Sequence, residues 1–185
     1  MKRPFCGTPL DVDDERSREA YERALVALNR HGVPVATQYD RPGEPPSLDT
    51  HFPTGIIAMS IAQHVFEGLF TLDKDFRPIP LLAESYSVTD GGRRAVVKLR
   101  RGVQFHNGKE FSSEDAVASL KRLMRLEYHF RSFIAPNMVD VRAPDRYTVE
   151  FLLKKPSSML LPVMSTATAP MYPREVIDEF KEERI

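Results

Sequence analysis

Proline is the residue type that most restricts how this chain can fold. Fifteen of the 185 residues are proline. Each one fixes its own φ angle and lacks a backbone N–H donor, so proline is excluded from helix interiors and from the middle of a sheet. A chain interrupted this often is expected to form many turns and short elements, and a bundle of long helices is excluded.

Composition places the chain among ordinary globular proteins. Hydrophobic residues make up 42% and charged residues 28%, which is enough apolar material for a buried core. Lys and Arg together number 26, as do Asp and Glu, so the basic excess typical of nucleic-acid binders is absent. The single cysteine, Cys6, excludes an internal disulfide. No apolar run reaches the 18 residues of a membrane-spanning helix.

The N-terminal stretch predicts a helix without an export signal. Met1-Lys-Arg3 is followed by Pro4 and mixed residues, whereas a secretory signal needs about 7–15 apolar residues there. Residues 11–30 repeat small apolar side chains at helical spacing, with acidic residues at the start. We interpret this helix as a packing or capping element, with a partner-binding helix as the alternative.

The rest of the chain alternates strand-like and helix-like patterns. Strands are predicted at 33–39, 83–89, 93–100, 139–142 and 147–153, and helices at 56–69, 112–125, 157–165 and 173–181. Asp90-Gly91-Gly92 predicts a hairpin turn, and Asn107-Gly108 a second tight turn flanked by Phe105 and Phe111. Helices inserted between antiparallel hairpins indicate an α+β fold.

The helix that begins at Ser112 has the clearest start signal in the sequence. Ser112 and Asp115 have the spacing of a capping box. Near its end, Lys121, Arg122 and Arg125 form a basic cluster. We interpret this cluster as a solvated helix face, and a nucleic-acid patch is the alternative.

Sequence motifs give little support to catalysis. Phosphate-binding loops, metal-ligand spacings and a nucleophile elbow are all absent from the sequence, so we predict no metal, cofactor or catalytic residue. Histidines such as His51 and His64 are expected to be hydrogen-bonded or exposed. An enzyme using Glu67 or His106 as a base remains an alternative hypothesis.

Several segments taken together resemble one family. They are Ser47-Leu-Asp49, His64-Val-Phe-Glu-Gly-Leu-Phe70, Pro80-Leu-Leu-Ala-Glu-Ser85, Val97-Lys-Leu-Arg-Arg-Gly-Val-Gln-Phe-His-Asn-Gly-Lys109 and Ser113-Glu-Asp-Ala-Val-Ala-Ser-Leu-Lys-Arg122. In order and spacing they resemble the family 5 extracellular solute-binding proteins of ABC importers, the dipeptide-, oligopeptide- and nickel-binding class.

This resemblance implies a periplasmic binding protein-like fold of type II, cluster C, in which two lobes close on a ligand. It implies that residues 33–185 form the N-terminal part of lobe I with its added subdomain, and that residues 1–32 are an unmatched helical extension. Because family members are much longer, we expect the chain to be a fragment.

The same resemblance implies a function without chemistry. The intact protein would capture a peptide or similar small solute in the periplasm or cell envelope, deliver it to ABC permease subunits, and be a monomer that binds no nucleic acid. The loop after the first strand would lie at the cleft, which makes Tyr39, Glu44 and Pro46 the candidate ligand contacts. The alternative is a non-transport interaction module made from the retained subdomain.

Overall fold

A computed structural model describes residues 48–51, 56–127 and 130–181. The predicted helix at 11–30 and the predicted strand at 33–39 lie outside these ranges. The described helices and strands follow the order α2 (Ile56–Val65), β1 (Phe70–Leu72), β2 (Pro78–Pro80), β3 (Ala83–Thr89), η1 (Asp90–Gly92), β4 (Arg94–Leu99), α3 (Ser113–Leu126), η2 (Phe130–Ile134), η3 (Ala135–Asn137), β5 (Met138–Asp145), β6 (Thr148–Leu153), α4 (Leu160–Met164) and α5 (Arg174–Phe180).

A four-stranded antiparallel sheet with strand order β3-β4-β6-β5 is the centre of the fold. Asp90-Gly91-Gly92 closes the β3–β4 hairpin, and all three residues have positive φ, which glycine accepts without strain. On β4, Ala95, Val97 and Leu99 are buried, as their alternation predicts. The α+β prediction and the hairpin prediction are therefore confirmed.

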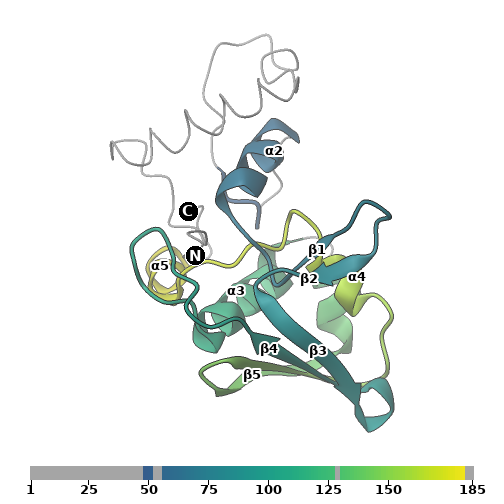
Figure 1. Cartoon of the computed structure of the whole chain (residues 1–185). Helices are drawn as coiled ribbons and strands as arrows, with labels where there is room; N and C mark the ends of the chain where they lie inside the picture. The colour runs from purple at the N-terminus through teal and green to yellow at the C-terminus, as the bar shows by residue number, and fades with distance from the viewer. Residues whose placement is uncertain (1–47, 52–55, 128–129, 182–185) are drawn as a thin grey trace.

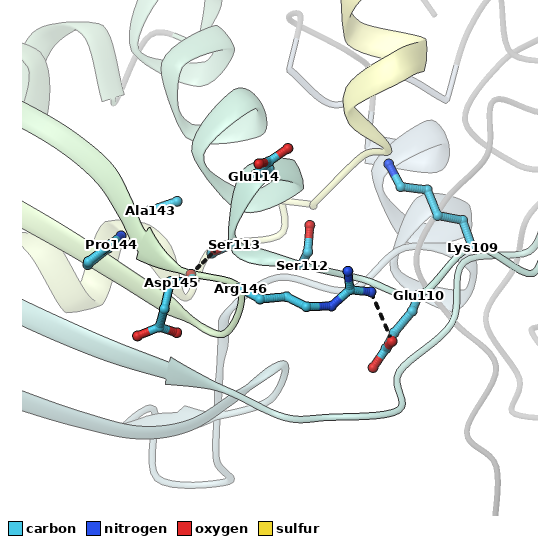
Figure 2. A pocket seen from close by; sticks show the side chains of 9 residues that line it. All are labelled: Lys109, Glu110, Ser112, Ser113, Glu114, Ala143, Pro144, Asp145 and Arg146. Atoms are coloured by element: carbon cyan, nitrogen blue, oxygen red, sulfur yellow. Dashed lines mark hydrogen bonds and ion pairs between the residues drawn. The ribbon is translucent and has the colours of Figure 1, made fainter.

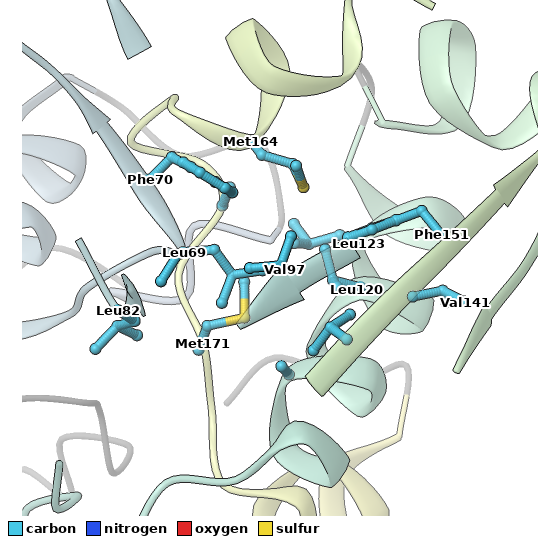
Figure 3. Packing of buried hydrophobic residues seen from close by; sticks show 14 of the residues in the cluster. Leu69, Phe70, Leu82, Val97, Leu120, Leu123, Val141, Phe151, Met164 and Met171 are labelled. Atoms are coloured by element: carbon cyan, nitrogen blue, oxygen red, sulfur yellow. The ribbon is translucent and has the colours of Figure 1, made fainter. Parts of the chain in front are cut away.

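Helix α3 covers one face of this sheet, as Figure 1 shows. The Asp115 carboxylate accepts a hydrogen bond from the Ser112 backbone N–H at 2.9 Å, which completes the predicted capping box. Figure 3 shows Leu120 and Leu123 of α3 pointing toward Val97 and Phe151 of the sheet. We call this cluster the sheet core. It also contains Leu69, Phe70, Leu82, Phe105, Phe111, Val141, Met164 and Met171.

A smaller apolar cluster lies beside the sheet core. Helices α2 and α5 contribute to it, together with residues just before each of them. We call it the second core; its buried members are Leu48, Ala58, Ile61, Ala62, Val65, Phe66, Tyr172 and Ile177. The described residues therefore form two apolar clusters, with α3 between the sheet and α5.

The helix predicted at 56–69 is too long, because α2 ends at Val65. After it, Gly68 pairs with Pro170 in an isolated antiparallel bridge. A Cβ atom at position 68 would lie 2.8 Å from the Ala169 carbonyl oxygen, so only glycine permits this close approach. The tertiary pairing with 169–170 therefore replaces the last predicted helical turn.

Residues 73–80 form the turn and the second strand of a β1–β2 hairpin. Asp73 organises the turn by accepting hydrogen bonds from the backbone N–H groups of Asp75 and Arg77 at 2.8 and 2.9 Å. Both prolines of β2 are tolerated because β2 is an edge strand of a two-stranded sheet. No further described strand pairs with its outer edge, so the missing backbone N–H donors are not required there.

Phe76 in this turn combines two unfavourable features. Its φ is +59°, and its side chain is 82% exposed. Phe76→Gly is therefore expected to raise the free energy of unfolding by about 1 kcal/mol, because glycine adopts positive φ without a Cβ clash. Chemical denaturation measures this change.

Phe133 provides the matched control for that substitution. It is 50% exposed, lies in η2 and does not have positive φ. Phe133→Gly is expected to destabilise the protein, since glycine weakens a helical segment by about 1 kcal/mol. Equal effects of the two substitutions would contradict the assignment of backbone strain to Phe76.

Candidate functional site

The three predicted ligand contacts, Tyr39, Glu44 and Pro46, lie outside the described residues, as does the proline-rich loop that contains them. The described chain begins at Leu48, directly after this loop. The polar groups that follow the loop in sequence, and those that contact them, are therefore the starting point for a site.

Helix α3 has a second, polar stripe that faces away from the sheet core. Asp115, Ser119 and Arg122 are spaced four and three residues apart and are all buried. Ser119 accepts a hydrogen bond from the Tyr172 backbone N–H at 2.8 Å and donates one to the Tyr172 carbonyl at 3.2 Å. Asp115 accepts from the Arg174 backbone N–H at 2.9 Å. This stripe fixes the chain at the start of α5.

Arg122 forms a fully buried ion pair with Asp49. Its two terminal nitrogens donate to the two carboxylate oxygens at 3.1 and 2.7 Å, and both side chains have no exposed surface. Its Nε also donates to the Lys181 carbonyl at 3.0 Å. A bidentate ion pair of this kind is strong and directional. It joins the segment before α2 to α3 and to the end of α5.

The prediction that Arg122 belongs to a solvated basic face is therefore wrong. Lys121 and Arg125 are exposed as expected, but Arg122 is buried and pairs with Asp49, which lies 73 residues away in sequence. The spacing of Asp115, Ser119 and Arg122 was the available signal, because three polar residues at i, i+4 and i+7 share one helix face. Sequence reasoning missed this stripe.

His51 completes a group that we call the Asp49 cluster, made of Asp49, His51, Arg122 and Tyr172. The His51 ring is fully buried and lies edge-on to the Tyr172 ring, with centroids 4.7 Å apart. Its Nε2 lies 3.0 Å from the Pro170 carbonyl oxygen. A carbonyl oxygen only accepts, so Nε2 carries the proton and Nδ1 is the unprotonated nitrogen.

The environment of His51 favours its neutral form. The pKa of His51 is lowered from 6.5 to about 4; burial is the main cause and the Arg122 guanidinium acts in the same direction, whereas the Asp49 carboxylate and the hydrogen bond to the Pro170 carbonyl oppose both. Among the described residues, Nδ1 has no hydrogen-bond partner. The cluster therefore contains one ion pair and one neutral imidazole, and it joins segments that are distant in sequence.

A separate surface pocket of about 640 Å³ lies at the start of α3 (Figure 2). We call it the Lys109 pocket; it is lined by Lys109, Glu110, Ser112, Ser113, Glu114, Ala143, Pro144, Asp145 and Arg146. Ser113 Oγ donates to the Asp145 carbonyl at 2.5 Å, which joins α3 to the β5–β6 turn across the pocket floor.

Charged groups of the Lys109 pocket are held in ion pairs, with each other or with residues beside the pocket. Lys109 Nζ donates to Asp115 at 2.7 Å and also bonds Glu175, and Arg146 donates to Glu110 at 3.0 Å. Burial opposes the charge on Lys109, but the two carboxylates outweigh burial and raise its pKa. The pocket is therefore a polar surface held by ion pairs between neighbouring segments.

The two candidate bases of the enzyme hypothesis are not brought together at this pocket. His106 is exposed and its Nε2 lies 3.3 Å from the Val65 carbonyl oxygen, while Glu67 is half-buried. Neither residue lines the Lys109 pocket. Within the described ranges, no cluster of three His, Cys, Asp or Glu residues could hold a metal ion. The described helices also include none with the length and apolarity needed to cross a membrane.

Comparison with known proteins gives one consistent result. Residues 77–184 match the model of the bacterial extracellular solute-binding proteins, family 5 (middle region). The glutathione-binding protein GsiB of Salmonella choleraesuis is 28% identical over 135 residues, which are 72% of this chain and 26% of that protein. The chain thus spans about a quarter of the length of the curated relatives it matches.

Solved structures agree with the sequence comparison. The binding protein AgaA of A. tumefaciens R10, in complex with agropinic acid, superposes with a TM-score of 0.69 and 26% identity, over 77% of this chain and 29% of AgaA. The substrate-binding domain of an oligopeptide ABC transporter from Bacillus anthracis superposes with a TM-score of 0.65 and 26% identity, over 76% of this chain and 30% of that domain's chain.

These structural matches confirm the periplasmic binding protein-like fold, in the form of part of a lobe. The family model also covers more than half of the chain. The chain belongs to the family 5 bacterial extracellular solute-binding proteins of ABC importers.

Proposed function

We propose that this chain forms part of the first lobe of a protein that captures a peptide or similar small solute and delivers it to ABC permease subunits. The observation that carries the proposal is the superposition on AgaA and on the Bacillus anthracis oligopeptide transporter domain over about three quarters of this chain. Such a protein works in the periplasm or cell envelope and binds its solute without chemical change.

The division of the chain follows from the same proposal. Residues 33–185 belong to the lobe, and residues 1–32 form a helical extension. Tyr39, Glu44 and Pro46 contact the solute. An aromatic ring, a carboxylate and a rigid proline-rich backbone suit a peptide, because the carboxylate pairs with an amine and the ring packs on a side chain.

Titration of the ¹⁵N-labelled chain, followed by NMR, tests this proposal. One lobe buries only part of a solute, so weak binding is expected and a method that detects millimolar affinity is needed. The solutes are glutathione, a tetrapeptide, a nonapeptide, agropinic acid and a nickel–histidine complex. We expect saturable shifts with at least one peptide, centred on residues 39–46.

Glu44→Gln is expected to weaken that binding by about tenfold, which corresponds to about 1.4 kcal/mol. Glu84→Gln is the matched control, because Glu84 is an exposed carboxylate on β3. If Glu44→Gln binds the solute as tightly as the wild-type chain, the solute-binding role stands but the assignment of Glu44 as a ligand contact is overturned. If none of the five solutes gives saturable shifts, the proposed solute class is contradicted.

A further inference from the structure

Residues 48–51, which we call the strap, are attached to the rest of the fold through their side chains. Asp49 pairs with Arg122, and His51 donates to the Pro170 carbonyl. Thr50 Oγ1 donates to the Ala167 carbonyl at 3.3 Å. The strap belongs to none of the described strands or helices. It can therefore detach without breaking the hydrogen-bond ladder of the sheet.

The apolar contacts of the strap are also separate from the sheet core. Leu48 belongs to the second core, with Ala58 and Ile61 of α2 and Ile177 of α5. The four-stranded sheet and the apolar face of α3 pack in the other cluster. Segments that share few contacts with the main core open locally at a lower free-energy cost than global unfolding.

His51 is the group of the strap that makes its attachment sensitive to acid. Its Nε2 proton is already donated to Pro170, so an added proton goes to Nδ1, which is buried and has no hydrogen-bond acceptor in the described part of the chain. Within the described ranges, the charged and titratable groups around the ring are Asp49, Arg122 and Tyr172. Asp49 is engaged at both oxygens by Arg122, and the α2 side chains of the second core are apolar.

A protonated His51 would thus be a second buried cation beside Arg122, and among the described residues the only carboxylate that acts on His51 is Asp49, which already pairs with Arg122. Burying a charge without its own partner is strongly unfavourable, and exposure to water relieves it. We propose that the strap is an acid-released latch, in which protonation of His51 detaches residues 48–51 from α3 and from the 167–172 segment while the four-stranded sheet stays folded.

The direction of the pH effect follows from linkage. The pKa of His51 is about 4 when the strap is closed, below the 6.5 of an exposed histidine. The open form therefore binds a proton more readily, so the closed form loses stability as the pH falls from about 6.5 toward about 4 and keeps it above 6.5. Between pH 7 and pH 5 the equilibrium constant for opening is expected to rise about 20-fold.

Hydrogen exchange read by mass spectrometry, corrected for the intrinsic pH dependence of exchange, tests the latch on the full chain. Peptides covering residues 48–51 should lose protection by about 20-fold between pH 7 and pH 5. Peptides covering β4 and β6 should keep theirs. Equal loss of protection in the strap and in the sheet would indicate global unfolding and would overturn the proposal.

His51→Gln removes the titrating group and retains an N–H donor for Pro170. In this variant the strap should show the same protection at pH 7 and pH 5. His64→Gln is the matched control, because His64 is exposed and bonded only locally to the Ser60 carbonyl in the described contacts, and it should keep the wild-type pH response. A pH response that survives His51→Gln would overturn the proposal.

If His51→Gln opens the strap at every pH, a measurement on the wild-type chain still tests the latch. Nitrogen-15 NMR of the imidazole groups identifies the protonated nitrogen of each histidine. The latch requires a neutral His51 protonated at Nε2 at pH 7. A His51 that carries its proton on Nδ1, or that is already charged at pH 7, would overturn the latch.

Discussion

Arg122→Ala is expected to lower the free energy of unfolding by about 3–5 kcal/mol, the range found when one partner of a buried ion pair is removed. The Asp49 carboxylate has no exposed surface and would be left buried without its cation. Local release of the strap would relieve this charge and limit the global loss. The change is therefore measured both by chemical denaturation and by hydrogen exchange of residues 48–51, where protection should be lost first.

Two further variants separate charge from packing. Lys121→Ala alters the adjacent exposed residue of the same helix and should change the free energy of unfolding by less than about 0.5 kcal/mol. The double variant Arg122→Met with Asp49→Leu replaces the pair by apolar side chains and should recover much of the lost stability. A small effect of Arg122→Ala in both measurements would contradict the buried pair.

The second large effect is expected at the Asn107-Gly108 turn. Phe111→Ala should cost about 3–5 kcal/mol in the free energy of unfolding, because it empties a fully buried site in the sheet core. The Phe111 ring lies edge-on to Phe105, with centroids 5.7 Å apart, and both hold the turn against the core. Chemical denaturation measures the loss.

Phe133→Ala is the control for that cavity. The side chain is half exposed, so its removal should cost about 1 kcal/mol or less. Similar losses of stability for Phe111→Ala and Phe133→Ala would show that Phe105 and Phe111 do not anchor the Asn107-Gly108 turn.

The local features of this fold could be predicted from the sequence because they depend on neighbours. The hairpin at Asp90-Gly91-Gly92 needs glycine at positive φ, and the α3 start needs a serine and a carboxylate three residues apart. The alternation on β4 correctly indicated its buried residues. The family itself was recognised from short segments in a fixed order, and the comparisons confirm it.

Other features depended on residues far apart in the chain. Helix α2 ends early because Gly68 pairs with Pro170. The sequence around residue 68 does not indicate this long-range pairing. Arg122 has the same local surroundings as its exposed neighbours Lys121 and Arg125, and only its contact with Asp49 makes it buried. The proposed ligand contacts at Tyr39, Glu44 and Pro46 remain predictions from the resemblance.

The sequence by itself determined the α+β class, the hairpin, the helix cap and the family, since turn geometry, capping and side-chain periodicity act within a few residues. Only the tertiary structure decided that Arg122, Asp49 and His51 form one buried cluster. Whether a charge is solvated or buried depends on which distant segment packs over it, and in this chain that segment lies 73 residues away.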